Sequence, residues 1–196
     1  MSHAVVIKKA VKKYGNFTAL NGVDLEIKPG EFFTLLGPSG CGKTTTLRMI
    51  AGLETPTEGE IYIDGKPADI TCPEDSERLG VAIIYQEFNL VPGLTVAENI
   101  FMGHEIKKNH MIQWKAMNEE ANKLLKQLNA DFDSTAEMGT LSVAQQQMVE
   151  IAKALSTNAK IVILDEPTAS LTKRESEELY RIVDQLKEKG VSIIFI

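Results

Sequence analysis

The stretch that decides the fold is Gly37-Pro38-Ser39-Gly40-Cys41-Gly42-Lys43-Thr44. It follows residues 32–36, an apolar segment typical of a buried strand, and precedes residues 45–51, a helical segment that Gly52 ends. Glycines let backbone N–H groups converge on phosphate oxygens, and a helix start adds partial positive charge. This order of elements predicts a phosphate-binding loop rather than an ordinary glycine-rich turn. We expect Lys43 to reach the β- and γ-phosphates of a nucleotide and the Thr44 hydroxyl to ligate Mg²⁺.

An acidic pair, Asp165-Glu166, follows residues 161–164, which are continuously apolar as in a strand buried on both faces. Ligands of open parallel sheets bind at the carboxyl ends of the strands. We therefore expect Asp165 to hold Mg²⁺ and Glu166 to act as general base toward an attacking water. Taken alone, the pair is equally typical of two solvated acids near a helix start. The phosphate loop favours the catalytic interpretation.

The remaining pattern predicts an α/β domain. Residues 5–7, 23–27 and 60–65 are typical of short strands and turns, whereas residues 68–160 look mainly helical. Two capping boxes predict helix starts, at Ser142 with Gln145 and at Thr172 with Glu175. The helical faces comprise Trp114, Met117, Ala121, Leu124, Leu125 and Leu128; Met148, Ile151, Ala152 and Leu155; and Leu179, Ile182, Val183 and Leu186. Residues 191–196 predict a last buried strand, and because the chain stops there we expect a C-terminal truncation.

Bulk composition narrows the function. A chain of 196 residues has the size of one domain, and its net charge of −6 argues against a generalist nucleic-acid binder. No run of about 18 apolar residues occurs, and the N-terminus lacks the pattern of a signal peptide. Two cysteines suggest no disulfide framework. We expect a cytoplasmic protein that another chain holds at any membrane.

An ordered set of motifs now carries a family resemblance. The set comprises Tyr14, the loop 37–44, Gln86 within 85–87, the segment Leu141-Ser142-Val143-Ala144-Gln145, and Asp165-Glu166-Pro167-Thr168. It covers nearly the whole chain and resembles the ATP-binding cassette (ABC) ATPases that drive membrane transporters. The resemblance implies a P-loop NTPase fold with a mainly parallel core sheet, an N-terminal antiparallel β subdomain and a helical subdomain at about 88–158. Residues 1–196 would form one nucleotide-binding domain, incomplete at its C-terminus.

The resemblance also implies roles. Tyr14 would stack on adenine, although a lone tyrosine is more often half-buried packing. Gln86 would contact Mg²⁺ and the attacking water, and its loop would face a transmembrane partner. Residues 142–145 would touch ATP held by a second cassette in a head-to-tail dimer. The expected catalytic residues are Lys43, Gln86 and Glu166, and the expected metal ligands are Thr44, Gln86 and Asp165. The expected nucleotide contacts are Tyr14, Gly37, Pro38, Ser39, Gly40, Cys41, Gly42, Lys43, Thr44, Thr45, Ser142, Val143, Ala144 and Gln145.

Three departures from the family pattern limit these roles. Val143 and Ala144 stand where the signature usually has glycines, so its contacts with a γ-phosphate are expected to be weakened. Thr172 stands where an aspartate is usual, and its capping box explains it structurally. The usual switch histidine would lie about two residues beyond Ile196. The chain as given is therefore expected to bind nucleotide but to hydrolyse it poorly.

Subfamily features are mixed. Residues from about 80 onward resemble the first cassette of the tandem ATPases of monosaccharide importers, whereas residues 14–65 look more like maltose-type or polyamine-type importer ATPases. A natural or engineered mosaic joined near 65–80 is one interpretation of this mixture.

The leading hypothesis is the ATP-hydrolysing subunit of a sugar importer, peripheral at the cytoplasmic face of the cell membrane. Its partners would be a second cassette, transmembrane permease subunits and, indirectly, a periplasmic or extracellular substrate-binding protein. Two alternatives stay open: a truncated or chimeric cassette that binds ATP and Mg²⁺ but powers nothing, and a soluble ABC protein acting on nucleic acid or ribosomes. The net charge of −6 argues against the last.

Overall fold

The computed structural model describes residues 4–38, 40–85, 89–169 and 171–196, which form two compact units. Unit 1 comprises Met1–Ile83, Ala159–Glu166 and Val183–Ile196. Unit 2 comprises Ile84–Asn158 and Pro167–Ile182. Each unit is described by itself below.

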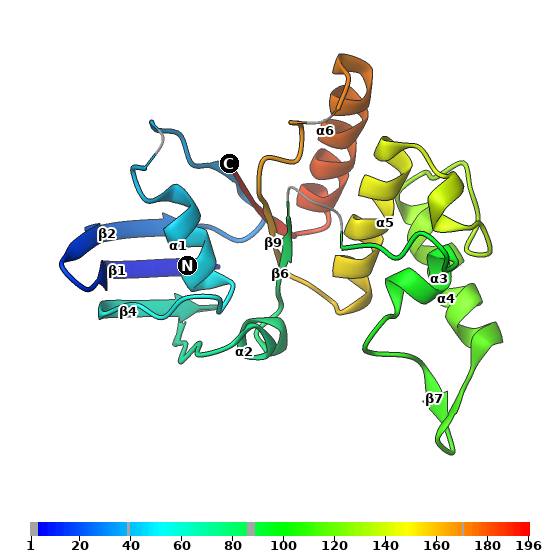
Figure 1. Ribbon diagram of the computed structural model, residues 1–196, viewed down its shortest axis with the longest axis horizontal. Coiled ribbons are helices and arrows are strands. Elements are labelled where there is room, and N and C mark those ends of the chain that lie inside the picture. Colours follow the sequence, from blue (N-terminus) through cyan, green and yellow to red (C-terminus); the bar gives the residue numbers. More distant parts are fainter. Residues whose placement is uncertain (1–3, 39, 86–88, 170) are drawn as a thin grey trace. The chain divides into compact units, whose positions relative to one another are not determined.

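Unit 1 contains an antiparallel sheet near its N-terminus. Its strands are β1 (Val5–Tyr14), β2 (Phe17–Ile27), β4 (Glu58–Ile63) and β5 (Lys66–Pro67), in the order β2-β1-β4-β5. Figure 1 shows β2, β1 and β4 side by side. The antiparallel β region expected from the resemblance is confirmed, but β1 is longer than the three residues that the sequence predicted.

A bulge in β1 explains why its full length was hidden. Lys9 has a positive φ of 47°, and its backbone N–H donates to Asp24 Oδ1 at 2.9 Å. Gly59 on β4 also has a positive φ, and a Cβ at this position would lie 2.5 Å from the Lys9 carbonyl oxygen. The bulge breaks the alternation of apolar and polar residues. Beyond it, the register with β2 shifts once more between Lys12 and Lys13, and the Lys12 ammonium lies 5.1 Å from the centre of the Tyr14 ring.

The second sheet of unit 1 is parallel where its register is defined. Its strands are β3 (Phe32–Thr34), β6 (Val81–Ile84), β9 (Ile161–Leu164) and β10 (Ser192–Phe195), in the order β3-β10-β9-β6. β10 pairs in parallel with both β3 and β9. β9 and β10 are buried throughout, as the sequence predicted, whereas β6 was not predicted.

The prediction of a buried strand over residues 32–36 was wrong in extent and burial. The strand ends at Thr34, its two phenylalanines are only half-buried, and Leu36 is 86% exposed. The physical reason is position: among the described strands β3 lies at the sheet edge and pairs only with β10. The chain then leaves the sheet toward the glycine-rich loop.

Helix α1 (Lys43–Ile50) follows that loop and packs against both sheets of unit 1. Its Gly52 stop is confirmed, since Gly52 lies just beyond the C-cap Ala51 with a positive φ of 76°. One hydrophobic core joins the helix to strands of both sheets, through Leu47, Met49 and Ile50 of α1 with Val5, Ile7, Ile61, Ile161, Ile163 and Ile194. The short helix α2 (Pro73–Arg78) lies further along. This shared core fixes the start of α1 relative to the strands that lead to it.

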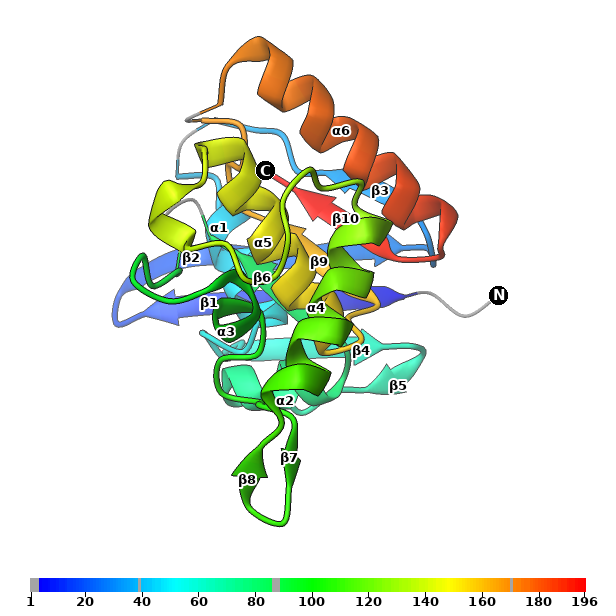
Figure 2. The ribbon, with the colours of Figure 1, turned by 90° about the vertical axis from the view of Figure 1, so that its right-hand side faces the viewer.

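Unit 2 is mainly helical. It holds α3 (Val96–Ile100), α4 (Trp114–Gln127), the 3₁₀ turn η1 (Met138–Thr140) and α5 (Val143–Ser156). A hairpin of β7 (Lys107–Lys108) and β8 (Met111–Ile112) extends beyond the N-terminal end of α4 (Figure 2). α6 (Lys173–Glu188) begins in this unit. None of the helices in the described part of the chain is long and apolar enough to cross a bilayer.

Both capping boxes are confirmed. Ser142 accepts from the Gln145 N–H at 3.3 Å at the start of α5, and Thr172 accepts from the Glu175 N–H at 3.3 Å at the start of α6. The predicted apolar faces need two corrections. Trp114 is 52% exposed because it is the first residue of α4, so the stripe begins only at Met117. The buried side of α5 is also displaced from the predicted face: Ile151 and Ala152 are buried together with Gln147 and Glu150, whereas Met148 and Leu155 are only half-buried, because α3 and α4 both pack against the helix.

Candidate functional site

The glycine-rich loop joins the end of β3 to the start of α1. Leu35 N donates to the Phe195 carbonyl at 2.9 Å, which ties the entry of the loop to β10. At the exit, Gly42 is the N-cap of α1 in the left-handed conformation, and its carbonyl accepts from the Thr46 N–H and hydroxyl, both at 2.9 Å. Strand, loop and helix follow one another as the motif requires. Ser39 lies outside the described residues.

Two glycines serve this loop differently. Gly40 has a φ of 80° and no heavy atom within 4 Å of a built Cβ, so its surroundings are open. Gly42 has a φ of 92°, and a Cβ there would lie 2.5 Å from Leu20 Cδ2 and 3.0 Å from the Ala19 carbonyl. The first position needs glycine for its backbone conformation and the second for conformation and close packing alike.

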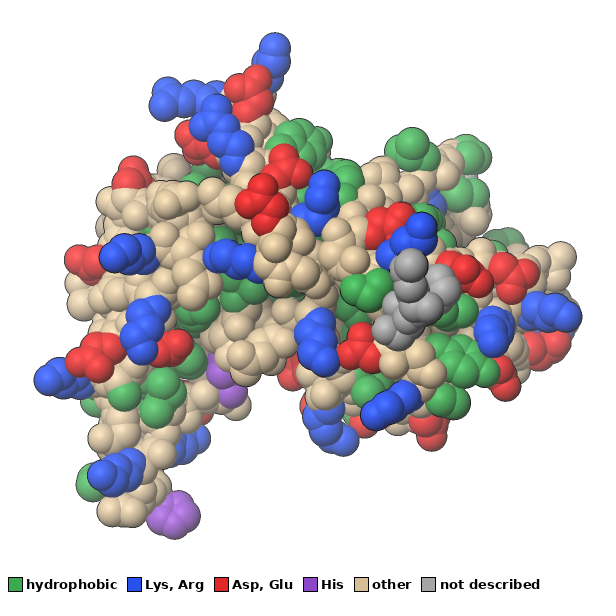
Figure 3. All heavy atoms as spheres, turned by 180° about the vertical axis from the view of Figure 1, so that it is seen from behind, with side chains coloured by type: hydrophobic (Ala, Val, Ile, Leu, Met, Phe, Trp, Pro, Cys, Tyr) green, Lys and Arg blue, Asp and Glu red, His purple; other side chains and the backbone are tan. Residues whose placement is uncertain are grey.

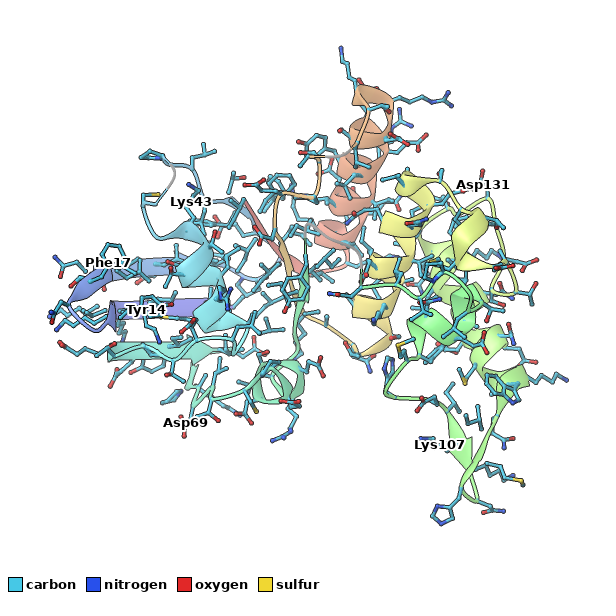
Figure 4. All side chains as sticks on the ribbon, in the orientation of Figure 1. Tyr14, Phe17, Lys43, Asp69, Lys107 and Asp131 are labelled. Carbon is cyan, nitrogen blue, oxygen red and sulfur yellow. The ribbon has the colours of Figure 1, made fainter. Side chains whose placement is uncertain are left out.

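Lys43 folds back over its own loop. Its ammonium group donates to the carbonyl oxygens of Gly37 at 2.7 Å and Pro38 at 3.0 Å, and lies 3.6 Å from Cys41 Sγ. Figure 4 shows Lys43 at the loop end of α1. A flexible cation held by neutral groups of its own loop at a helix N-terminus can be redirected to an anion bound there. Thr44 is exposed on the first turn and Thr45 is half-buried.

The acidic pair and the loop both follow the carboxyl ends of strands in the parallel sheet. β3 and β9 are both parallel to β10, so their carboxyl ends, which lead to Gly37 and Asp165, meet at one edge. Two strand spacings separate them by roughly 10 Å. Burial and, secondarily, repulsion from Glu166 raise the pKa of Asp165, and Arg48 opposes this. Glu166 is exposed and has a positive φ of 45°, a strained conformation for a non-glycine residue.

The oxygen donors at this end of the parallel sheet suit a Mg²⁺ ion whose coordination a bound nucleotide would complete. Mg²⁺ takes oxygen ligands and usually combines one or two carboxylates with substrate phosphates and water. The Thr44 hydroxyl and the half-buried Asp165 carboxylate are such ligands. Within the described ranges, no group of three or more His, Cys, Asp or Glu side chains is placed to hold a metal by itself. These side chains therefore suit a metal site in which the phosphates of the substrate supply some of the ligands.

Tyr14 ends β1 at the tip of the β1–β2 hairpin, where it pairs with Phe17 (Figure 4). Its side chain is 45% exposed. Burial and a hydrogen bond to Glu54 raise the pKa of its hydroxyl, so the phenol is neutral near pH 7. The Lys12 ammonium lies 5.1 Å from the centre of the ring. The sequence motifs pointed to Tyr14 but not to Lys12 or Glu54. Glu54 is forty residues away along the chain, and the contact of Lys12 with the ring becomes visible only in the structure.

Gln86 lies outside the described residues, but unit 2 shows how the segment after it is held. The Asn89 N–H donates to Glu150 Oε1 at 2.8 Å, and Lys153 Nζ donates to the Asn89 carbonyl at 3.5 Å. Burial raises the pKa of Glu150, against the opposing effects of Lys153 and of the Asn89 bond. Two side chains of α5 therefore hold both backbone groups of one residue.

The signature-like segment of unit 2 caps α5. The Gln145 amide is fully engaged: its oxygen accepts from the Ser142 N–H at 2.9 Å and its nitrogen donates to Asp131 Oδ1 at 2.9 Å. Val143 is exposed, and Ala144 lines a cavity of about 10 Å³ beside α6. The segment presents a helix N-terminus with small side chains, and Gln145 is committed to holding it in shape.

Comparison with known proteins agrees with this geometry. A protein-family profile described as ABC transporter matches residues 20–169. The chain belongs to the ABC transporter family. The ribose import ATP-binding protein RbsA of Corynebacterium glutamicum is 45% identical over 190 residues, which cover 97% of this chain and 36% of that protein. RbsA 2 of Escherichia coli O157:H7 is 44% identical over 190 residues, covering 97% of this chain and 38% of that protein. The chain thus spans little more than a third of the length of these curated ABC relatives.

Solved ABC structures match the fold. An ATP-binding cassette of an ABC transporter in its ADP conformation gives a TM-score of 0.89 at 28% identity, covering 100% of this chain and 81% of that one. A dimeric cassette bound to ADP and Pi gives 0.79 at 34% identity, covering 97% of this chain and 86% of that one. The expected ABC ATPase fold and the resemblance to monosaccharide-importer ATPases are therefore confirmed.

Proposed function

We propose that the chain binds ATP and hydrolyses it as the cassette of an importer that takes up a sugar. The observation that carries the proposal is the arrangement of the loop 37–44: Lys43 covers it at the N-terminus of α1, and the Asp165-Glu166 pair shares its sheet edge. The names of the relatives, ribose import ATP-binding proteins, support a pentose as the sugar class.

The loop residues bind and orient the phosphates. Backbone N–H groups of the loop residues other than Pro38, which has none, and the helix N-terminus hold the phosphate oxygens, while Lys43 moves from its carbonyls to the β- and γ-phosphates. The Tyr14 ring stacks on adenine. Ser142, Val143, Ala144 and Gln145 contact ATP of a partner cassette, as the dimeric match supports.

The acids serve the hydrolytic step. Mg²⁺, when bound, neutralises charge on the phosphates. Thr44, Gln86 and Asp165 are its proposed ligands. Glu166 orients and deprotonates the attacking water, a role suited to an exposed carboxylate at the sheet edge. In this proposal Glu166 is the base, Asp165 is a metal ligand, and both follow the strand β9, whose carboxyl end lies beside that of β3 and β10.

The partners follow from the same proposal. A second cassette, permease subunits in the membrane and, indirectly, a substrate-binding protein would complete the importer, with this chain peripheral at the cytoplasmic face. A role on nucleic acid finds little support, because Lys and Arg side chains are interspersed with Asp and Glu on the face in Figure 3, and the net charge is −6.

Titration of the purified protein with Mg²⁺ and ATP tests the proposal. Lys43→Ala should weaken ATP binding by about ten- to a hundredfold, because a charged hydrogen-bond partner is worth about 1.5–3 kcal/mol. Lys160→Ala, which removes an exposed lysine paired with Asp64, is the control. Glu166→Gln should keep ATP binding, lose hydrolysis and accumulate an ATP-bound dimer on size-exclusion chromatography. Equal ATP affinity of wild type and Lys43→Ala would refute the site.

A further inference from the structure

We infer that Lys12 and Glu54 are positioning residues that hold the Tyr14 ring in place for an adenine base. The inference deepens the proposed function and rests on it. Its basis is a cluster of side chains at the end of β1 that no sequence motif links, because Lys12 and Glu54 come from different segments of unit 1.

Lys12 makes three contacts with one ammonium group. It forms a 2.8 Å ion pair with Glu54 Oε2, donates to the Thr55 carbonyl at 2.8 Å and lies 5.1 Å from the centre of the Tyr14 ring. Its side chain is only 12% exposed. A lysine this well covered and this well partnered has little freedom, so the cation is fixed against the ring.

Glu54 anchors the Lys12 ammonium beside the tyrosine. Its carboxylate forms the ion pair with Lys12 and lies 3.9 Å from Arg48 of α1. The hydrogen bonds and charges of Lys12, Tyr14 and Arg48 together lower the pKa of Glu54 despite its burial, with Lys12 the largest cause. The carboxylate stays charged at neutral pH and bridges the hairpin to the helix of the phosphate loop.

The consequence is a preorganised aromatic surface. The Lys12 ammonium lies over the Tyr14 ring and Glu54 holds that ammonium in place through their ion pair, yet nearly half of Tyr14 stays exposed for a flat ligand. A free tyrosine at a hairpin tip would lose rotamer entropy on binding a base, whereas a restrained one has lost it already. The gain in affinity from this restraint therefore applies to ligands that carry a base and not to phosphates alone.

Two ligands separate this role from a general effect on folding. We measure the affinities of ATP and of inorganic triphosphate, each with Mg²⁺, for wild type, Lys12→Met and Glu54→Gln. Lys12→Met should weaken ATP binding about three- to tenfold, which is the range expected for immobilising one side chain. Glu54→Gln should weaken ATP binding somewhat less. Triphosphate affinity should stay within about twofold of wild type for both variants.

Lys13→Met is the matched control. Lys13 is the next residue of the same strand and also pairs with a glutamate, but its partner is Glu58 at 2.9 Å and not Glu54. It should leave both affinities unchanged. In a Tyr14→Ala background, Lys12→Met should have no further effect on ATP, because its action passes through the ring.

The outcomes are separable. If Lys12→Met weakens ATP and triphosphate equally, or adds its full effect to Tyr14→Ala, the inference is overturned and Lys12 acts only on folding. If Lys12→Met and Glu54→Gln change neither affinity while Lys43→Ala weakens both ligands, the inference fails and the proposed function stands. If Lys43→Ala also changes nothing, the proposed function itself fails.

Discussion

Gly42 packs so closely against Leu20 that a Cβ atom at position 42 would lie 2.5 Å from Leu20 Cδ2. Leu20 belongs to β2 and Gly42 caps the helix that follows the phosphate loop. The antiparallel sheet therefore supports the loop directly, and the loop conformation depends on a contact outside the motif.

Gly42→Ala should destabilise the protein by about 2–4 kcal/mol, since it adds a left-handed backbone strain to a packing clash. Thermal or urea unfolding measures the loss. Gly40→Ala is the control, because the same left-handed strain arises there with no atom nearby, and its cost should be only about 1–2 kcal/mol. Equal costs at the two positions would mean that Leu20 simply moves aside.

Asn99→Ala should destabilise unit 2 by about 2–4 kcal/mol. Asn99 is fully buried, accepts from the Val91 N–H at 2.7 Å and donates to the carbonyls of Val91 at 3.1 Å and Thr95 at 3.0 Å. Its loss removes the acceptor of the Val91 N–H and several bonds at a fully buried side chain, although the Val91 and Thr95 carbonyls still accept from the Leu94 and Asn99 N–H groups. Asn122→Ala, which removes one partly buried bond to the Ser134 N–H, should cost only about 1–2 kcal/mol. A similar loss of unfolding free energy in the two variants would contradict the stabilising role of the Asn99 hydrogen bonds.

Glu150→Gln should change how stability depends on pH. Burial raises the pKa of Glu150 above its ordinary value of 4.5, so its ionisation costs more in the folded protein than in the unfolded chain. Wild-type stability therefore falls as pH rises from 4.5 through the folded value, and a neutral Gln avoids that loss. The amide oxygen still accepts the Asn89 N–H.

We expect Glu150→Gln to unfold at a higher temperature than wild type at neutral pH, with the gap closing toward pH 4.5. Glu119→Gln on the exposed side of α4 should show no such trend. A gap that grows as pH falls would reverse the sign and contradict the raised pKa.

Thr172→Ala should cost about 1 kcal/mol in unfolding free energy, whereas Thr172→Ser should cost almost nothing. Thr172 caps α6 through its hydroxyl, which donates to Glu175 Oε2 at 2.7 Å and accepts from the Glu175 N–H at 3.3 Å. Serine keeps both bonds. Loss of ATP hydrolysis in Thr172→Ser, measured beside unchanged stability, would assign this residue a catalytic role instead of a cap.

Local signals explain what the sequence could predict. The phosphate loop, the strand before Asp165, the stop at Gly52 and the two capping boxes are each encoded in a few adjacent residues, and each was placed correctly apart from the extent of β3. The capping box of Thr95 with Glu98 was equally visible and would have located α3.

Non-local contacts explain what the sequence could not predict. The burial of Glu150 and Asn99 depends on segments that pack around them, and an isolated charged or amide residue on a helix is more often exposed. The hairpin of β7 and β8 is too short to show an alternation. The roles of all the proposed site residues stay predictions, and those of Gln86 and of Ser142 to Gln145 depend in addition on a residue that the structure does not describe or on a second cassette.

The bulge at Lys9 has a consequence for how this hairpin can vary between relatives. Because strand side chains alternate, deleting one residue between Lys9 and Tyr14 would turn the tyrosine to the other face, away from Glu54. Deleting two would restore its side. Gly59 locks the bulge in place, since no Cβ fits opposite the Lys9 carbonyl. Insertions and deletions in this strand should therefore survive selection in even numbers, and an odd change should be accompanied by a shifted aromatic residue.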